Sequence, residues 1–362
     1  MMAGTSMSAP IAASAHALYK SAKGKKESPV ELHSIFTTTA QPLKFNSSID
    51  VLDSVARQGG GMLRVDRAIA SSTRVFPDFH SLNDTEFFNG TQMLKITNVG
   101  NKAQLYTFEH LPAGSVYGCN QTTGELAVGP LVPVNFHHAS VKYQPTSVRI
   151  APGQSTTITV VYTAPTVAPR QCTLYSGYTH IKSDDEHGSL TVAYLGYAAG
   201  MRALPIIRYR PEPNKLPDLS DPSTRMTIRD GAVYSLQETG QQPVLDYRLN
   251  AGSRLTTVDL IYANASTAAS SLAAHSPGRP HGHLPQNAIY ARVATFADLP
   301  SDWNGVFPFA LTSTVTDAQN VTRTVVDGAY RVLVRALKLR GDVQKEEDYE
   351  RWISPSFTVK AS

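Results

Sequence analysis

The residue whose surroundings best suit chemistry stands almost at the start of the chain. Ser6 lies in the stretch GTSMSAP (4–10), between a small Gly-Thr pair and an alanine-rich run with helical spacing. A serine in the first turn of a helix presents its hydroxyl at the positive end of the helix dipole, where backbone N–H groups can face a developing oxyanion. The stretch therefore predicts Ser6 as a nucleophile. The alternative is a helix rich in serine and alanine that carries no chemistry.

A serine hydroxyl is a weak nucleophile unless a general base within hydrogen-bond reach removes its proton. On the helix predicted to contain Ser6, the nearest histidine is His16, ten residues further along the chain. The rise of the helix separates the two side chains by about 15 Å along its axis, which excludes His16 as the base. Ser6 therefore has no predicted base within its own helix.

The other candidates for chemistry give weaker signals. Neither His137-His138 nor His281/His283 has a cluster of carboxylates or cysteines nearby, so we expect no metal site and no cofactor. Asp184-Asp185-Glu186 is more simply a solvated acidic turn than a calcium site, and Glu346-Glu347-Asp348 is expected to be a charged hairpin turn. Four tyrosines are expected in the core and at the edges of a β-sandwich rather than in a sugar-binding stack: Tyr175, Tyr178, Tyr194 and Tyr197.

The elements that would position Ser6 are helical. Met7, Ile11, Ala15 and Leu18 recur at spacings of three and four residues and so form one apolar helix face. Pro10 requires this helix to begin close to Ser6, since proline is tolerated only near a helix start. Further helical pieces are predicted over 29–39 (after Ser28) and near 50–57, and 62–70 is predicted to be a short helical or extended piece. Residues 1–72 are therefore predicted to be a helical segment.

The hydrophobic period changes to two after this segment, which is typical of strands. Leu94 and Ile96 alternate with polar residues, and turns rich in Gly, Pro and Asn recur at about ten-residue intervals. Three further regions are predicted: a β-sandwich over 75–203, an extended and solvated linker over 204–223, and a second β-sandwich over 224–362. The predicted fold class is mostly β with helices at the N-terminus.

Composition limits the classes of function. The 362 residues carry a net charge of +4, and the cations are scattered apart from the short cluster at 20–26, so we expect no nucleic-acid partner. No apolar run has the length of a transmembrane helix. Two cysteines, Cys119 and Cys172, are either an inert pair or one disulfide. Six Asn-X-Ser/Thr sequons suggest a secretory route: Asn46, Asn83, Asn89, Asn120, Asn264 and Asn320.

Several stretches resemble one family. GTSMSAP followed by an alanine-rich helix is similar to the surroundings of the nucleophile in subtilisin-like serine proteases (subtilases), and GGGMLRVDRAIA (59–70) resembles the end of their catalytic domain. QMLKITNVGNKAQLYTF (92–108), SVRIAPGQSTTITVVYTAP (147–165) and SLTVAYLGYAAGMRALP (189–205) resemble the fibronectin type III-like domain that follows it in large secreted subtilases, although Ala193 stands where the family often has proline. The region with DWNG (302–305) and VVDGAYRVLVRAL (325–337) is similar to the C-terminal β-domain of minor extracellular proteases.

The resemblance implies a role for each region. Residues 1–72 would be the helical C-terminal remnant of an α/β subtilisin-like catalytic domain, with Ser6 as the catalytic serine, followed by two β-sandwich domains. Subtilases carry the triad in the order Asp, His, Ser, and the printed sequence has no Asp-Thr-Gly, Asp-Ser-Gly or His-Gly-Thr stretch that would supply the first two. The chain is therefore expected to be a fragment that is inactive by itself.

Two functions remain open from the sequence. The first is a secreted serine endopeptidase that acts on proteins or peptides, with possible association with a cell wall or cell surface. The second is a non-catalytic β-sandwich protein that binds a surface or partner and keeps only a relic of the protease. Met7, Ile11 and Leu18 favour the first, because a genuine non-catalytic product should have lost the apolar stripe of a helix that no longer packs.

Overall fold

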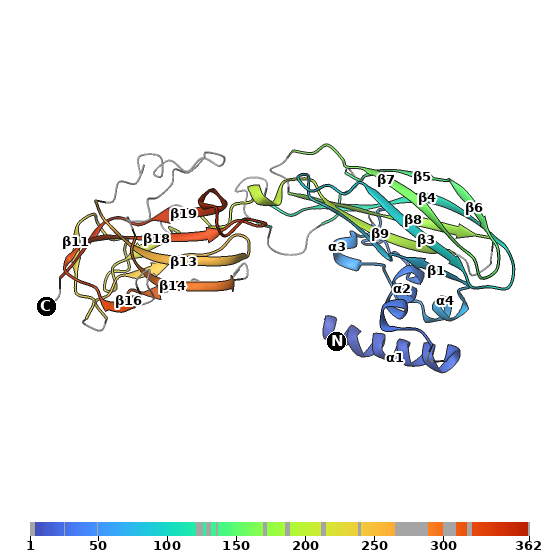
Figure 1. Cartoon of the computed structure of the whole chain (residues 1–362), viewed down its shortest axis with the longest axis horizontal. Helices are drawn as coiled ribbons and strands as arrows, with labels where there is room; N and C mark the ends of the chain where they lie inside the picture. Colours follow the sequence, from blue (N-terminus) through green and yellow to red (C-terminus); the bar gives the residue numbers. More distant parts are fainter. Residues whose placement is uncertain are drawn as a thin grey trace. The chain divides into compact units, whose positions relative to one another are not determined.

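The computed structural model describes residues 4–24, 26–48, 50–120, 126–127, 132–134, 137–168, 172–184, 189–210, 215–237, 240–264, 289–299, 309–316 and 321–360. The chain divides into two compact units, Met1–Gly200 and Met201–Ser362 (Figure 1). Helices come first and strands make up most of the remainder, which confirms the predicted fold class. The finer boundaries at 72, 75, 203 and 223 stay predictions. His281/His283, Asp185-Glu186, the DWNG stretch (302–305) and Asn320 lie outside the described ranges.

The first unit begins with four helices: α1 (Thr5–Lys23), α2 (Pro29–Thr39), α3 (Val55–Gln58) and α4 (Val65–Ala70). The predicted bounds of α2 are confirmed and have a local cause. The Ser28 side chain accepts a hydrogen bond from the Glu31 backbone N–H, and the Glu31 carboxylate accepts one from the Ser28 N–H, which is a complete capping box. Pro29 occupies the first helical position, where its missing N–H does no harm.

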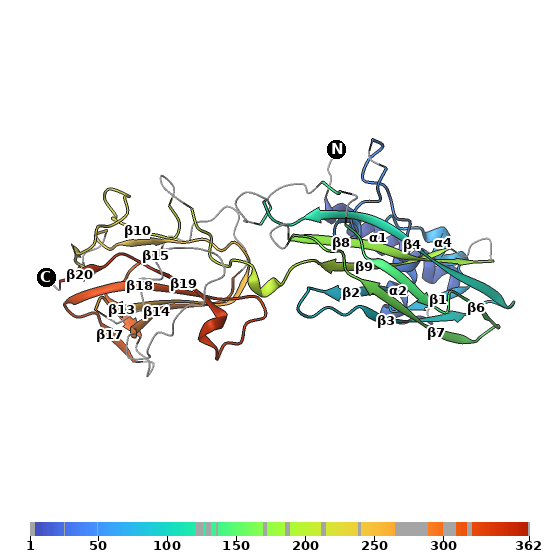
Figure 2. The same cartoon turned by 90° about the horizontal axis from the view of Figure 1, so that it is seen from above.

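The strands of the first unit form two antiparallel-dominated sheets that face each other (Figure 2). One sheet has the order β1-β3-β7-β5 and the other the order β2-β9-β8-β4-β6. Their bounds are β1 Thr73–Phe76, β2 Phe79–Asn83, β3 Thr91–Asn98, β4 Gln104–Tyr117, β5 Ser140–Gln144, β6 Ser147–Ile150, β7 Ser155–Thr163, β8 Thr173–Ser183 and β9 Leu190–Tyr197. The predicted sandwich is therefore present.

The sandwich core consists of the side chains that alternation placed on one face of each strand. Leu94, Ile96, Ile158 and Val160 are fully buried in one cluster with residues of the second sheet. Three of the four predicted core tyrosines, Tyr175, Tyr178 and Tyr194, are also buried. The helices lie on one side of this sandwich (Figure 1), where Val55 of α3 packs against Tyr178 and Ala193.

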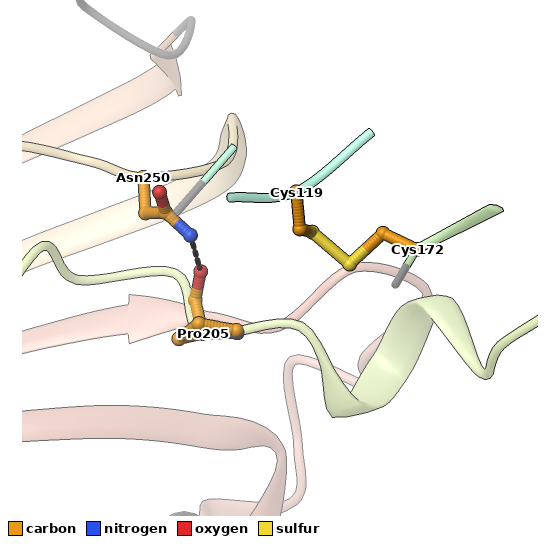
Figure 3. The surroundings of a disulfide bond; sticks show 4 residues. All are labelled: Cys119, Cys172, Pro205 and Asn250. Carbon is orange, nitrogen blue, oxygen red and sulfur yellow. Dashed lines mark hydrogen bonds between the residues drawn. A yellow bond between two sulfur atoms is a disulfide. The ribbon is translucent and has the colours of Figure 1, made fainter. Parts of the chain in front are cut away.

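The two cysteines are joined. Cys119 and Cys172 form a disulfide with a Cα–Cα distance of 5.4 Å (Figure 3). Cys119 follows β4 and Cys172 precedes β8, and these two strands pair directly through Val116↔Leu174 and Tyr117↔Thr173. The ladder therefore already holds the two backbones at the separation that a disulfide requires. Of the two alternatives left by the sequence, the structure shows the disulfide.

The second unit is built from a three-stranded sheet in the order β10-β12-β15 and an eight-stranded sheet in which β11-β20-β18-β13-β14-β16-β17 form one path and β19 pairs with β18. Its strands are β10 Asp218–Ser220, β11 Ala232–Tyr234, β12 Val244–Asp246, β13 Ser253–Tyr262, β14 Ile289–Leu299, β15 Phe309–Ala310, β16 Thr314–Thr316, β17 Thr322–Thr324, β18 Gly328–Leu337, β19 Tyr349–Ile353 and β20 Phe357–Val359. Val332 and Val334 of β18 are fully buried.

The stretch 204–223 is not the solvated linker that its proline and charge content predicted. Ile206 and Ile207 are buried, and 218–220 forms β10. The Ile207 backbone N–H donates to the Glu350 carboxylate at 3.1 Å, and the Asn250 side chain donates to the Pro205 carbonyl at 3.1 Å (Figure 3). The backbone polar groups of this stretch are thus satisfied by residues that are distant in sequence, which local composition cannot reveal.

The acidic turn predicted at Glu346-Glu347-Asp348 is a short 3-10 helix, η5, between β18 and β19. Its position agrees with the prediction, but it is not simply a solvated turn. Asp348 is buried, accepts the Asp342 N–H at 2.8 Å and is paired with Arg202. Glu346 lies 2.7 Å from Nη1 of Arg335, which itself is mostly buried. These carboxylates hold the strands of the second unit together instead of facing water.

Candidate functional site

Ser6 is the second residue of α1, and its side chain is exposed. Gly4 caps the helix without any side-chain hydrogen bond, and the Met7 backbone N–H donates to the Gly4 carbonyl at 3.0 Å. The helix begins where the sequence predicted, so the Ser6 hydroxyl stands at its positive end. The local arrangement proposed for a nucleophile is therefore present, but it faces solvent.

Within the described ranges no residue forms a hydrogen bond with the Ser6 hydroxyl. His16 is on the same helix, but its Nδ1 donates to the Ala12 carbonyl at 2.7 Å, and its ring lies against Phe36 with centroids 4.4 Å apart. A hydroxyl without a base keeps its proton near neutral pH. In the part of the chain that the structure describes, the Ser6 hydroxyl is exposed and has no base within hydrogen-bond distance.

The surface of α1 next to Ser6 is apolar and open. Met7, Ile11 and Leu18 are 42%, 64% and 59% exposed, although they belong to the face predicted to pack. Only Ala15 of that face is buried, together with Tyr19 on the neighbouring side, against Leu32 and Phe36 of α2. A shallow hollow between α1 and residues 61–65 is lined by Ile11, Ala12, Leu18 and Met62. An exposed apolar stripe of this kind is typical of an interaction surface or of a surface that aggregates.

Two other histidines of the first unit belong to the sandwich. His80 is fully buried on β2, with its Nδ1 2.8 Å from the Tyr162 hydroxyl, and burial lowers the pKa of His80 to about 4. His110 lies 2.9 Å from the Tyr194 hydroxyl, and its pKa is also lowered by burial to about 4. Both imidazoles are neutral at physiological pH. They act as polar members of a packed core rather than as acids or bases.

The other predicted candidates do not assemble into a site. Among the described residues, no three His, Cys, Asp or Glu side chains come together in a way that could hold a metal ion. His138 lies beside the ring of His110, with centroids 5.7 Å apart. Asp184 accepts the Leu105 backbone N–H at 3.0 Å and so closes a strand end. None of the helices in these ranges has the length and apolar character of a membrane span.

Sequence reasoning missed one ionic network, in the second unit. Asp259 on β13 is fully buried and pairs with Arg292 of β14 and Arg335 of β18, the latter at 3.0 Å. Arg335 continues to Glu346, which pairs with Arg351 of β19. The signal that could have found it is Arg335 within the apolar run of β18. The network crosses four strands, so we assign it to holding the sheet rather than to chemistry.

Comparisons with known proteins place two regions of the chain. Residues 1–68 match the model of the subtilase family, and residues 80–195 match that of an Fn3-like domain. The first match contains GTSMSAP, α1 to α3 and part of α4, and the second runs from β2 into β9. A subtilase-family segment is therefore followed by an Fn3-like domain. No curated protein matches the chain.

Solved structures with a related outline share little sequence. PapD-like domain 7 of human CEP192 has 13% identity and a TM-score of 0.26, covering 35% of this chain and 84% of that domain. The class 5 fimbriae chaperone CfaA has 8% identity and a TM-score of 0.25, covering 78% of this chain and 98% of that one. These scores are too low to support any inference about fold or function.

Proposed function

We propose that this chain, which joins a subtilase-family segment to an Fn3-like domain, is the nucleophile-bearing part of a subtilisin-like serine endopeptidase. One observation carries the proposal. Ser6 stands in GTSMSAP, inside the matched segment, at the exposed N-terminal turn of α1. The family supplies the reaction class, and the geometry supplies a serine whose hydroxyl is presented at the positive end of a helix.

In the proposed reaction Ser6 Oγ attacks the carbonyl carbon of a peptide bond. A histidine from the upstream part of a catalytic domain takes the hydroxyl proton, and an aspartate orients that histidine. The Ser6 backbone N–H and an asparagine side chain stabilise the oxyanion of the tetrahedral intermediate. Its collapse breaks the C–N bond, the histidine returns the proton to the leaving amine, and water later hydrolyses the acyl-serine.

We further propose that the 362-residue chain does not hydrolyse peptides by itself. The printed sequence offers no triad Asp or His stretch, and deleting the base lowers the turnover of a serine protease by about six orders of magnitude. The exposed stripe of Met7, Ile11 and Leu18 supports this proposal, because it is the surface on which the sheet carrying the missing residues would pack.

The test compares the chain alone with the chain fused behind a subtilase catalytic core that supplies Asp, His and the oxyanion Asn and ends just before Gly4. A fluorophosphonate probe should label the fusion at Ser6 and leave the chain alone unlabelled. Casein hydrolysis should follow the same pattern. Ser6→Ala should abolish both signals in the fusion. Ser8→Ala, two residues along the same exposed helix turn, is the matched control and should keep them.

Two results would count against the proposal. Labelling that persists in the Ser6→Ala fusion would place the nucleophile elsewhere, and labelling of the isolated chain would show that a base is present within it. A folded fusion that neither labels nor cleaves casein would favour the non-catalytic reading, in which the two β domains bind a surface or partner. We also propose that the endopeptidase acts on proteins or peptides and that it associates with a cell wall or cell surface.

A secreted location completes the proposal. The Cys119–Cys172 disulfide supports it, since such bonds persist in oxidising compartments. Asn46, Asn89 and Asn120 are exposed acceptors of sequons and support it in the same way. Recovery of the oxidised, glycosylated chain from the medium of its native cells is the measurement that checks this location.

A further inference from the structure

Two adjacent phenylalanines, Phe87 and Phe88, lie in the loop between β2 and β3. Phe87 is 49% exposed and Phe88 is 38% exposed. They directly precede Asn89-Gly90-Thr91, which is one of the sequons. A pair of exposed rings on a surface loop is unfavourable in water unless something covers it, and the acceptor residue follows the rings without a gap.

The loop is held in a defined shape around Asn89. The Asn89 backbone N–H donates to the Leu82 carbonyl at 3.1 Å, and the Gly90 carbonyl accepts the Tyr162 N–H at 2.7 Å. The Phe88 ring lies directly against Gly90, because a Cβ atom at Gly90 would stand 2.5 Å from Cε1 of Phe88. The Phe87 N–H donates to the Asp84 carboxylate at 3.0 Å. The Phe88 ring is therefore held next to the acceptor, and the backbone of Phe87 is anchored two residues before it.

The Asn89 side chain is free to react. It is exposed, and within the described part of the chain no residue forms a hydrogen bond with its amide group. Thr91, the hydroxyl residue of the sequon, is exposed at the first position of β3. Asn83, six residues earlier, differs: it is half-buried with a φ of 59°, and the next residue of its sequon, Asp84, is buried. One of the two acceptors, Asn89, is thus exposed in the loop, and the other, Asn83, is half-buried at the end of β2.

We propose that Asn89 carries an N-linked glycan whose first N-acetylglucosamine packs on Phe87 and Phe88. In the modification the Asn89 amide nitrogen bonds to the anomeric carbon of a lipid-pyrophosphate-linked oligosaccharide. The C–O bond to pyrophosphate breaks, the lipid pyrophosphate leaves, and a base takes the amide proton. The apolar C–H face of the sugar then removes ring area from water. The proposal rests on the secreted location proposed above.

Occupancy is tested by producing the full chain in a secreting eukaryotic host, which imposes passage through the secretory route whatever the native location or activity. An amidase that releases whole glycans converts an occupied asparagine to aspartate, and peptide mass mapping then reads each site. We expect Asn89 to be mostly occupied and Asn83 mostly unoccupied. Thr91→Ala should remove the modification at Asn89 alone. An unmodified Asn89 in a secreted, folded chain overturns the proposal.

The packing is tested on a chain in which the other five acceptor asparagines are glutamine. Trimming with an endoglycosidase leaves one N-acetylglucosamine, and this form should melt about 2–4 °C above the form with the sugar fully removed. Phe87→Ser, which keeps the sequon, should lose most of that difference. A difference unchanged by Phe87→Ser overturns the packing. Should the five-fold variant not fold, the same comparison between the unsubstituted chain and Thr91→Ala decides the question.

Discussion

α1 and α2 follow each other in the chain and belong to the same matched segment, yet they depend on their surroundings differently. α2 begins with a reciprocal cap between Ser28 and Glu31 and buries six of its eleven residues. α1 begins without a side-chain cap, contains Pro10 and leaves Ile11 and Leu18 exposed. α2 is packed by this chain, as is the sandwich beneath it. α1 is packed on one side only.

The difference shows that an apolar periodicity predicts a helix more securely than it predicts what covers the helix. The spacing of Ile11 and Leu18 is as regular as that of a buried face, but burial needs a partner surface. α1 is held by Ala15 and Tyr19. Ala15 belongs to the predicted apolar face, whereas Tyr19 does not. Both segments form the helices that their sequences predict, but only α2 has a partner surface that buries its apolar face.

The largest contrast is expected from the same substitution on the two kinds of surface. Leu94→Ala opens a cavity in the sandwich core, where Leu94 is fully buried, and should lower the free energy of unfolding by about 3 kcal/mol. Leu18→Ala on α1 should change it by less than about 0.5 kcal/mol. Urea unfolding, followed by far-UV circular dichroism, measures both free energies. Equal losses would mean that α1 is packed after all.

Acid should destabilise the β-sandwich of the first unit, where His80 is buried. Burial lowers the pKa of His80 to about 4, below the ordinary histidine pKa of 6.5. The unfolded chain therefore binds more protons between these values, and stability falls as pH falls through this window. From pH 7 to pH 5 the loss attributable to His80 should be about 2 kcal/mol. His80→Gln should flatten the dependence of unfolding free energy on pH, whereas a curve that keeps its slope would contradict this assignment.

A smaller effect is expected at the helix caps. Ser28→Ala removes the side-chain acceptor of the α2 capping box and should destabilise the first unit by about 1 kcal/mol. Gly4→Ser introduces a side-chain acceptor at α1, where the extended backbone of Gly4 accommodates any residue, and should add only a few tenths of a kcal/mol. Thermal unfolding of the two variants beside the parent chain checks both signs.

The smallest change in stability is expected when exposed apolar residues of α1 are replaced by serine, although this replacement should alter the binding properties of the surface. Met7→Ser with Ile11→Ser should leave the unfolding free energy within about 0.5 kcal/mol, because both side chains already meet solvent. Binding of a hydrophobic dye to the folded chain should decrease. Dye binding that stays unchanged would show that the stripe on α1 is not the apolar surface that the dye detects.

Features encoded by neighbouring residues were predictable from the sequence. Ser28, Pro29 and Glu31 define the start of α2 because capping involves only one helical turn. Leu94 and Ile96 identified a core strand because side chains alternate along a sheet. The assignment of Ser6 as a nucleophile also depends on a short motif, and it stays a prediction. In each case the physical cause spans only a few residues.

Features that depend on distant partners were not predictable. Ile206 and Ile207 looked like part of a polar linker, yet their N–H groups are bound by Glu350, more than 140 residues away. Asp348 looked like a surface charge, but it is buried. The ion pair with Arg202 and the hydrogen bond from the Asp342 N–H offset the cost of burying its carboxylate. Composition reports the average character of a stretch, whereas burial is decided residue by residue through tertiary contacts.

The disulfide gives the first unit a property that its packing alone would not. Cys119 and Cys172 are 53 residues apart in sequence, so one backbone cut anywhere between them leaves both pieces attached to the same molecule. A single nick in that interval would be invisible by size until the bond is reduced. A cut there therefore leaves the two pieces of the first unit covalently joined instead of separating them.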